Sequence, residues 1–123
     1  MTLRQAQSKF AWMLGRLLVK SEVLNTPVAI LELYRSLETQ RAYVARKVSK
    51  TLNSKHLDGL AVDLLFLSDI EDDGKMNYSP EKYKELGLFW ESLGGRWGGR
   101  FGDNPATEKI EGWDPGHFEL DIK

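Results

Sequence analysis

The chain contains only two histidines, and each lies close to aspartate residues. Asp63 follows His56 by seven residues, and His117 follows Asp114 by three. Two imidazoles and one carboxylate form a suitable ligand set for Zn²⁺, and three protein ligands leave the fourth position open, as in catalytic zinc sites. The chain has no cysteine, so any transition metal must be held by histidine and carboxylate side chains. If His56, Asp63 and His117 share one ion, the fold must bring together two segments that are far apart in the sequence.

The same residues also have ordinary structural interpretations. A lone histidine is commonly a surface or core residue, and Asp58 and Asp63 fit a turn and a strand edge. Asp114-Pro115-Gly116 is a common turn sequence. Because a His-x6-Asp spacing is only moderately specific, spacing alone leaves metal binding and these structural roles both open.

Length and composition indicate one domain over residues 1–123, with 41% hydrophobic and 28% charged residues. A net charge of −1 provides no electrostatic footprint for nucleic acid. The sequence has no apolar run of about 18 residues and no small-residue cleavage site after its N-terminal stretch. We therefore expect no nucleic-acid partner, no membrane partner and no signal peptide. Apolar residues recur at helical spacing over residues 3–20; this helix could lie on a membrane surface, but packing on the core is favoured.

Periodicity and capping residues predict an α+β fold, a small antiparallel sheet flanked by helices. Helices are expected over residues 3–20, over 36–47 and from Ser79-Pro80 to Gly94-Gly95, and strands over 28–34, 60–67 and 116–122. Loops are expected over 50–58 and 103–112. If the last two strands are neighbours, Asp63 and His117 meet, and His56 arrives from the loop before the second strand.

Three further features have two interpretations each. Asp69-x-Glu71-x-Asp73-Gly74 resembles the start of a calcium loop, but Pro80 occupies the twelfth position, so a solvated hairpin turn is favoured. Trp97 could line a cleft, although a core indole between small residues is favoured. Glu119 shares a strand face with His117 and could orient its ring.

Three motifs carry a resemblance to a known family. In order they read Tyr34-Arg35-Ser36 with Gln40, then Ser54-x-His56-x-x-Gly59-x-Ala61-x-Asp63, and finally Asp114-x-x-His117-Phe118-Glu119. Over residues 28–122 the chain resembles the M15 zinc peptidases. That family includes D-Ala-D-Ala dipeptidases and carboxypeptidases and the L-alanyl-D-glutamate endopeptidases of phage lysis. The resemblance implies a fold like that of the DD-peptidases and of Hedgehog.

The resemblance implies a role for each residue of the site. His56, Asp63 and His117 would bind one Zn²⁺ per chain, and Asp114 would be the catalytic base, where many relatives have glutamate. Arg35 would bind substrate and stabilise the oxyanion, with a salt bridge to a nearby carboxylate as the alternative. Ser54 would lie in the substrate cleft, or would only cap the loop.

The implied function is hydrolysis of the L-Ala-D-Glu bond in the peptidoglycan stem peptide, by a monomeric endolysin that lyses the phage host. Such an enzyme is made in the host cytoplasm and reaches the periplasm after holin-type release. One alternative is a D,D-carboxypeptidase or dipeptidase that releases D-Ala. Another is a non-catalytic zinc-containing binding domain, which the acid at Asp114 disfavours.

Overall fold

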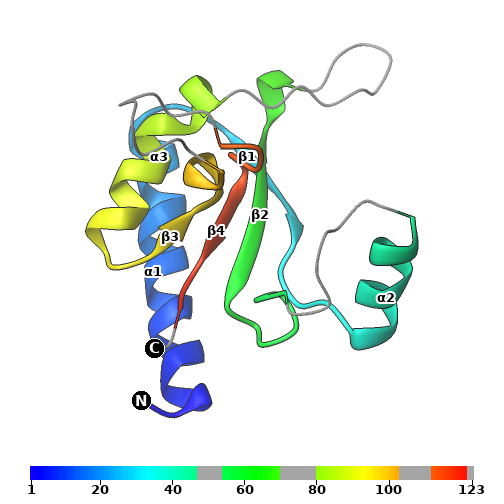
Figure 1. Ribbon diagram of the computed structural model, residues 1–123. Coiled ribbons are helices and arrows are strands. Elements are labelled where there is room, and N and C mark those ends of the chain that lie inside the picture. Colours follow the sequence, from blue (N-terminus) through cyan, green and yellow to red (C-terminus); the bar gives the residue numbers. More distant parts are fainter. Residues whose placement is uncertain (47–53, 70–79, 103–111, 122–123) are drawn as a thin grey trace.

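A four-stranded antiparallel sheet, in the order β1-β2-β4-β3, forms the centre of the molecule (Figure 1). The computed structural model describes residues 1–46, 54–69, 80–102 and 112–121. The strands are β1 Val28–Glu32, β2 Ala61–Phe66, β3 Arg96–Trp97 and β4 His117–Glu119. This arrangement confirms the predicted α+β class and antiparallel sheet.

Helices α1, Leu3–Val23, and α3, Pro80–Ser92, share one hydrophobic core with the sheet (Figure 1). Helix α1 begins with a capping box, in which Thr2 and Gln5 each bond the other's backbone N–H. Its inner stripe, which includes Phe10, Met13 and Leu17, is buried. The core-packing interpretation of this segment is therefore correct, and none of the described helices has the length and apolar character that crossing a bilayer requires.

Trp97 lies in this core, which confirms the favoured interpretation. The side chain is 1% exposed, and its Nε1–H donates to the Pro115 carbonyl at 2.7 Å. A Cβ at Gly87 would lie 2.1 Å from the indole, and one at Gly99 would lie 2.2 Å from it. The Trp97 ring fits here because Gly87 and Gly99 carry no side chain.

The predicted strands are longer than the observed ones, and for β1 the reason is contact with a distant segment. Strand β1 ends at Glu32 because the following backbone bonds to His56: the Leu33 carbonyl lies 2.7 Å from Nδ1, and the Arg35 N–H donates to the His56 carbonyl at 3.1 Å. Strand β4 is likewise limited to three residues. Strand β3 was not predicted, because two residues in a glycine-rich segment show no alternation.

Helix α2, Leu37–Ala45, stands beyond the edge strand β1 (Figure 1). Ser36 caps it by accepting a hydrogen bond from the Thr39 N–H at 3.1 Å, as the sequence predicts. Lys47 and the start of the predicted loop over 50–58 lie outside the described residues. So does nearly all of the loop over 103–112.

Asp69 ends a short 3-10 helix, Leu67–Asp69, directly after β2. Its buried carboxylate accepts hydrogen bonds from Lys82 Nζ at 2.7 Å and from the Tyr83 hydroxyl at 3.0 Å. These bonds already use Asp69 to join the end of β2 to α3. The rest of the acidic segment, including Glu71 and the turn predicted at Asp73-Gly74, lies outside the described residues.

Candidate metal centre

Asp63 and His117 face each other across the two central strands. They are direct register partners of the antiparallel β2–β4 pair. Their neighbours Val62 and Phe118 are buried in the core, so alternation places Asp63 and His117 on the opposite face of the sheet. This confirms the expectation that two neighbouring strands bring these side chains together.

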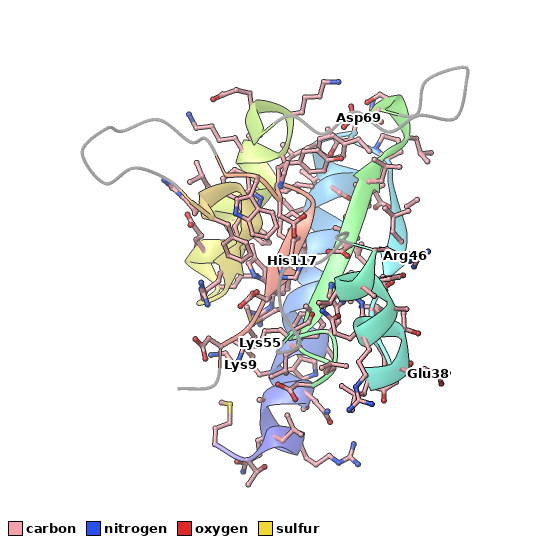
Figure 2. All side chains as sticks on the ribbon, turned by 45° about the vertical axis from the view of Figure 1, so that its right-hand side comes forward. Lys9, Glu38, Arg46, Lys55, Asp69 and His117 are labelled. Carbon is pink, nitrogen blue, oxygen red and sulfur yellow. The ribbon has the colours of Figure 1, made fainter. Side chains whose placement is uncertain are left out.

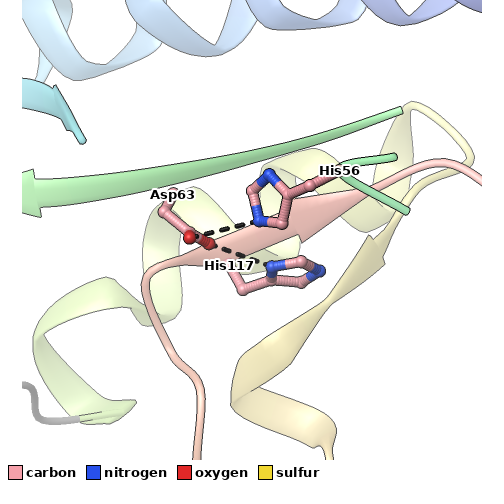
Figure 3. A group of neighbouring side chains, drawn as sticks. All are labelled: His56, Asp63 and His117. Atoms are coloured by element: carbon pink, nitrogen blue, oxygen red, sulfur yellow. Dashed lines mark hydrogen bonds and ion pairs between the residues drawn. The ribbon is translucent and has the colours of Figure 1, made fainter. Parts of the chain in front are cut away.

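His56 completes the group from the turn before β2 (Figure 3). Candidate ligand atoms of His56, Asp63 and His117 all lie within 4.8 Å of one another. The chain reverses at Gly59, whose φ of +68° is a left-handed conformation that glycine adopts without a steric penalty. The two imidazoles meet at a ring-centroid distance of 5.2 Å.

The orientation of His56 leaves one ring nitrogen available to a metal ion. Nδ1 lies 2.7 Å from the Leu33 carbonyl, which accepts only, so the proton resides on Nδ1 and Nε2 carries a lone pair. Nε2 is buried and meets no hydrogen-bond partner among the described residues. It lies 3.1 Å from Asp63 Oδ2, which is also an electron-pair donor. Two such atoms side by side are stabilised by a shared cation, so this donor set fits Zn²⁺.

His117 is held from both sides. Its Nδ1 lies 3.0 Å from Asp63 Oδ1, and its Nε2 lies 2.8 Å from Glu119 Oε1. Donation from Nε2–H to Glu119 fixes the ring so that Nδ1 faces Asp63 and His56, which is the orienting contact expected of Glu119. In the metal-free protein, burial alone would lower the pKa of His117, but the hydrogen bonds to Asp63 and Glu119 outweigh it and raise that pKa to about 9.

Asp63 is the shared carboxylate of the group. Burial tends to raise its pKa, but the hydrogen bond with His117 and the contact with the His56 imidazole outweigh burial and hold the pKa of Asp63 well below its usual range. The Asp63 carboxyl is therefore ionised at neutral pH. It offers one oxygen to each imidazole, as Figure 3 shows.

Asp114 borders the same group from the turn before β4. Its Oδ2 lies 3.8 Å from His117 Nδ1, and its carbonyl accepts the His117 N–H at 3.1 Å, which confirms the tight turn. Its side chain is 38% exposed. Burial is the main cause that raises the pKa of Asp114 to about 6. A Cβ at Gly98 would lie 1.9 Å from the Asp114 carbonyl oxygen, so only glycine permits this approach.

Arg35 and Ser54 lie on the other side of the group. Arg35 Nη2 is 3.8 Å from Asp63 Oδ2, and Nε forms an ion pair with Glu32. The salt bridge considered as an alternative for Arg35 is thus present, and the guanidinium also lies beside the candidate ligands. Ser54 Oγ accepts the His56 N–H at 3.2 Å, which is the loop-capping contact, and lies 3.5 Å from Arg35 Nη1.

Three neighbours of this site were not predicted from the sequence. Glu32 and Tyr43 hold Arg35, and the sequence offers no signal for them, because neither belongs to a motif and their contacts span a strand and a separate helix. Phe101, whose ring lies 5.6 Å from that of His117, comes from the glycine-rich segment and was not singled out either.

A metal-compatible His-Asp-His group on the face of an antiparallel sheet opposite the core, with a carboxylate beside it, is typical of metal-dependent hydrolases. The chain belongs to the M15 peptidase family. The family model, described as D-alanyl-D-alanine carboxypeptidase, matches residues 47–120, more than half of the chain. The protein is a metallopeptidase of this family. A comparison with curated proteins finds no match.

Solved structures of peptidoglycan peptidases share the fold. The L-Ala D-Glu endopeptidase ChiX of Serratia marcescens is 26% identical, with a TM-score of 0.53 over 78% of this chain and 68% of that chain. The vancomycin resistance D,D-pentapeptidase VanY, in complex with Zn(II), is 19% identical, with a TM-score of 0.59 over 90% of this chain and 70% of that chain. The LD-carboxypeptidase LdcB is 16% identical, with a TM-score of 0.58 over 91% of this chain and 57% of that chain. Because VanY and LdcB are less than 25% identical to this chain, their similarity shows the fold alone.

Metal binding is expected to displace a proton. At pH 7 the metal-free protein keeps His117 protonated, because its pKa lies near 9. The apparent zinc affinity should therefore rise about tenfold per pH unit between roughly pH 7 and 9 and then level off. Calorimetric titration of the metal-free protein with Zn²⁺, in buffers of different ionisation enthalpy, measures the released protons. The Glu119→Gln variant removes one cause of the raised pKa and should release fewer; equal release by both proteins would contradict this origin of the proton.

Proposed function

We propose that residues 1–123 form a single zinc peptidase domain that cleaves peptidoglycan stem peptides. His56, Asp63 and His117 would hold one Zn²⁺ per chain. The observation that carries this proposal is the buried, unpartnered Nε2 of His56, which points at Asp63 beside the second imidazole. Membership of a peptidase family supports the hydrolytic role.

The residues around the metal centre suit peptide hydrolysis. When bound, Zn²⁺ supplies Lewis acidity that polarises a carbonyl and makes water more acidic. Asp114 would take the proton of the attacking water and pass it to the leaving amine, and a pKa near 6 suits both transfers at neutral pH. The Arg35 guanidinium would stabilise the negative charge that develops on the peptide oxygen.

We propose the L-Ala-D-Glu bond as the cleavage site, in a phage endolysin that lyses its host. The likeness to an L-Ala D-Glu endopeptidase, the one likeness among the structures described above that exceeds 25% identity, supports this choice. The enzyme would be a monomer, with Arg35 and Ser54 in contact with substrate, and would act in the periplasm after holin-type release. Release of D-Ala by a D,D-carboxypeptidase is the second candidate, which the description of the family model favours.

Digestion of purified Gram-negative peptidoglycan tests the proposal. We expect released peptides that begin at D-Glu, with L-Ala left on the glycan, and complete loss of release when a chelator removes the metal. Mass spectrometry of the fragments identifies the bond, and added Zn²⁺ should restore the activity. Release of D-Ala alone would support the second candidate, and metal binding without any cleavage would support a non-catalytic binding domain.

A further inference from the structure

The guanidinium of Arg35 is held by side chains from two separate elements. Its Nε forms an ion pair with the Glu32 carboxylate of β1. Its Nη1 donates to Gln40 Oε1 of α2 at 2.6 Å and lies 3.5 Å from Ser54 Oγ. These contacts use the Nε and Nη1 side of the guanidinium, while Nη2 lies toward Asp63 at 3.8 Å. The side chain is only 9% exposed, so its direction is set by these contacts.

Tyr43 of α2 joins this arrangement through its hydroxyl and its ring. Its hydroxyl donates to Glu32 Oε2 at 3.0 Å, so Glu32 receives Arg35 on one oxygen and Tyr43 on the other. The Arg35 guanidinium lies 4.7 Å from the centre of the Tyr43 ring, a cation–π distance. We call Glu32, Gln40 and Tyr43 the Arg35 clamp.

One clamp residue, Glu32, lies in the row of residues that contains two of the candidate ligands. Glu32 is the register partner of Asp63, and Asp63 is the register partner of His117, so one row crosses β1, β2 and β4. The β1–β2 register shifts between Ile30 and Glu32. Such irregularities redirect a side chain, and this one places Glu32 opposite Asp63. Arg35 contacts both carboxylates and offsets their repulsion.

Helix α2 contributes two of the three clamp residues, although it stands beyond the sheet edge (Figure 1). Gln40 is the buried residue of this helix. The position of α2 and the direction of Arg35 are therefore linked through the same polar contacts. An unheld arginine has many rotamers to lose when it engages a transition state, whereas a clamped one is already oriented.

We infer that Glu32 and Tyr43 are positioning residues that keep Arg35 Nη2 directed at the metal centre. This inference rests on the proposed function, because it makes peptide hydrolysis depend on both residues through Arg35. Neither residue needs to touch the substrate.

The test uses two small changes in the full chain. Tyr43→Phe removes one hydroxyl and keeps the ring; Glu32→Gln keeps an acceptor and removes the charge. We expect kcat for wall-peptide release to fall about 3- to 10-fold in Tyr43→Phe and at least about tenfold in Glu32→Gln. Zinc content and melting temperature should stay close to those of the unaltered protein. Glu38→Gln is the matched control, since Glu38 lies at the exposed periphery of α2 (Figure 2).

A double-mutant cycle separates positioning from a general structural role. In an Arg35→Ala background, Tyr43→Phe and Glu32→Gln should each lower kcat by less than about twofold, because the group through which they act is gone. A loss as large as in the unaltered background would overturn the inference.

A second readout does not depend on activity. The Arg35 Nε–H resonance in nitrogen-15 NMR spectra should be ordered and protected in the metal-loaded protein, and should lose that protection in both clamp variants. Unchanged protection in both variants would overturn the inference, even if the wild-type protein cleaves the wall. Absence of wall cleavage by the wild type would instead remove the proposed function, and the NMR comparison would still decide whether the clamp orients Arg35.

Discussion

Replacing Asp114 with asparagine should lower kcat for wall-peptide release by about 10²- to 10⁴-fold, the usual contribution of a general acid–base group. Asparagine has nearly the same shape as aspartate but cannot take a proton from water. The Asp114 carboxylate lies 3.8 Å from His117 Nδ1 at the border of the candidate ligand group. The turn should survive, because its hydrogen bonds to Gly98 and His117 use backbone atoms of Asp114. Kinetics on purified peptidoglycan, together with zinc analysis, measure both effects.

The zinc content of the Asp114→Asn variant distinguishes a lost base from a lost metal. It should stay near that of the unaltered protein, because His56, Asp63 and His117 are unchanged. Asp58→Asn is the matched control. This aspartate follows His56 in the turn, and the hydrogen bonds described for it use backbone atoms: its carbonyl accepts from Gln7 and its N–H donates to the Lys55 carbonyl. Hydrolysis by Asp114→Asn at the rate of the control would refute the assigned base.

Replacing Trp97 with alanine should lower the free energy of unfolding by about 3–5 kcal/mol, the range for removing a large buried aromatic side chain. The indole is 1% exposed, and its removal also leaves the buried Pro115 carbonyl without its donor. That loss is a large fraction of the stability of a typical small domain. Urea denaturation of the metal-free protein, followed by circular dichroism, measures the change without a contribution from metal binding.

Trp12 provides the matched control for this stability change. It is a tryptophan of α1 that is 73% exposed. Its replacement by alanine should change the free energy of unfolding by no more than about 0.5 kcal/mol, as for ordinary surface positions. Equal effects of the two substitutions would show that burial of Trp97 does not govern its contribution.

Much of the fold could be predicted because local rules act over a few residues. The stripe of apolar residues and the Thr2 cap define α1, Ser36 starts α2, and Gly94, with a φ of +99°, follows the end of α3. The short strand β3 escaped prediction, because its pairing with β4 depends on a partner about twenty residues away rather than on its own pattern.

The two histidines could be named as ligands because the chain has only two histidines and no cysteine, and Asp63 because its motif resembles that of a known family. The roles assigned to Asp114, Arg35 and Ser54 came from that resemblance and stay proposals. The structure adds the positions of these side chains around one point on the sheet.

The amino-acid sequence by itself determined which residues can serve as metal ligands and where the helices and the strands β1, β2 and β4 form, since both follow from residue type and short-range spacing. Only the tertiary structure decided the row Glu32–Asp63–His117, because strand register depends on pairing between distant segments. It also decided the orientation of His56, whose Nδ1 meets the carbonyl of Leu33 on another element. Contacts of this kind join residues that share no local pattern, so no stretch of the chain encodes them alone.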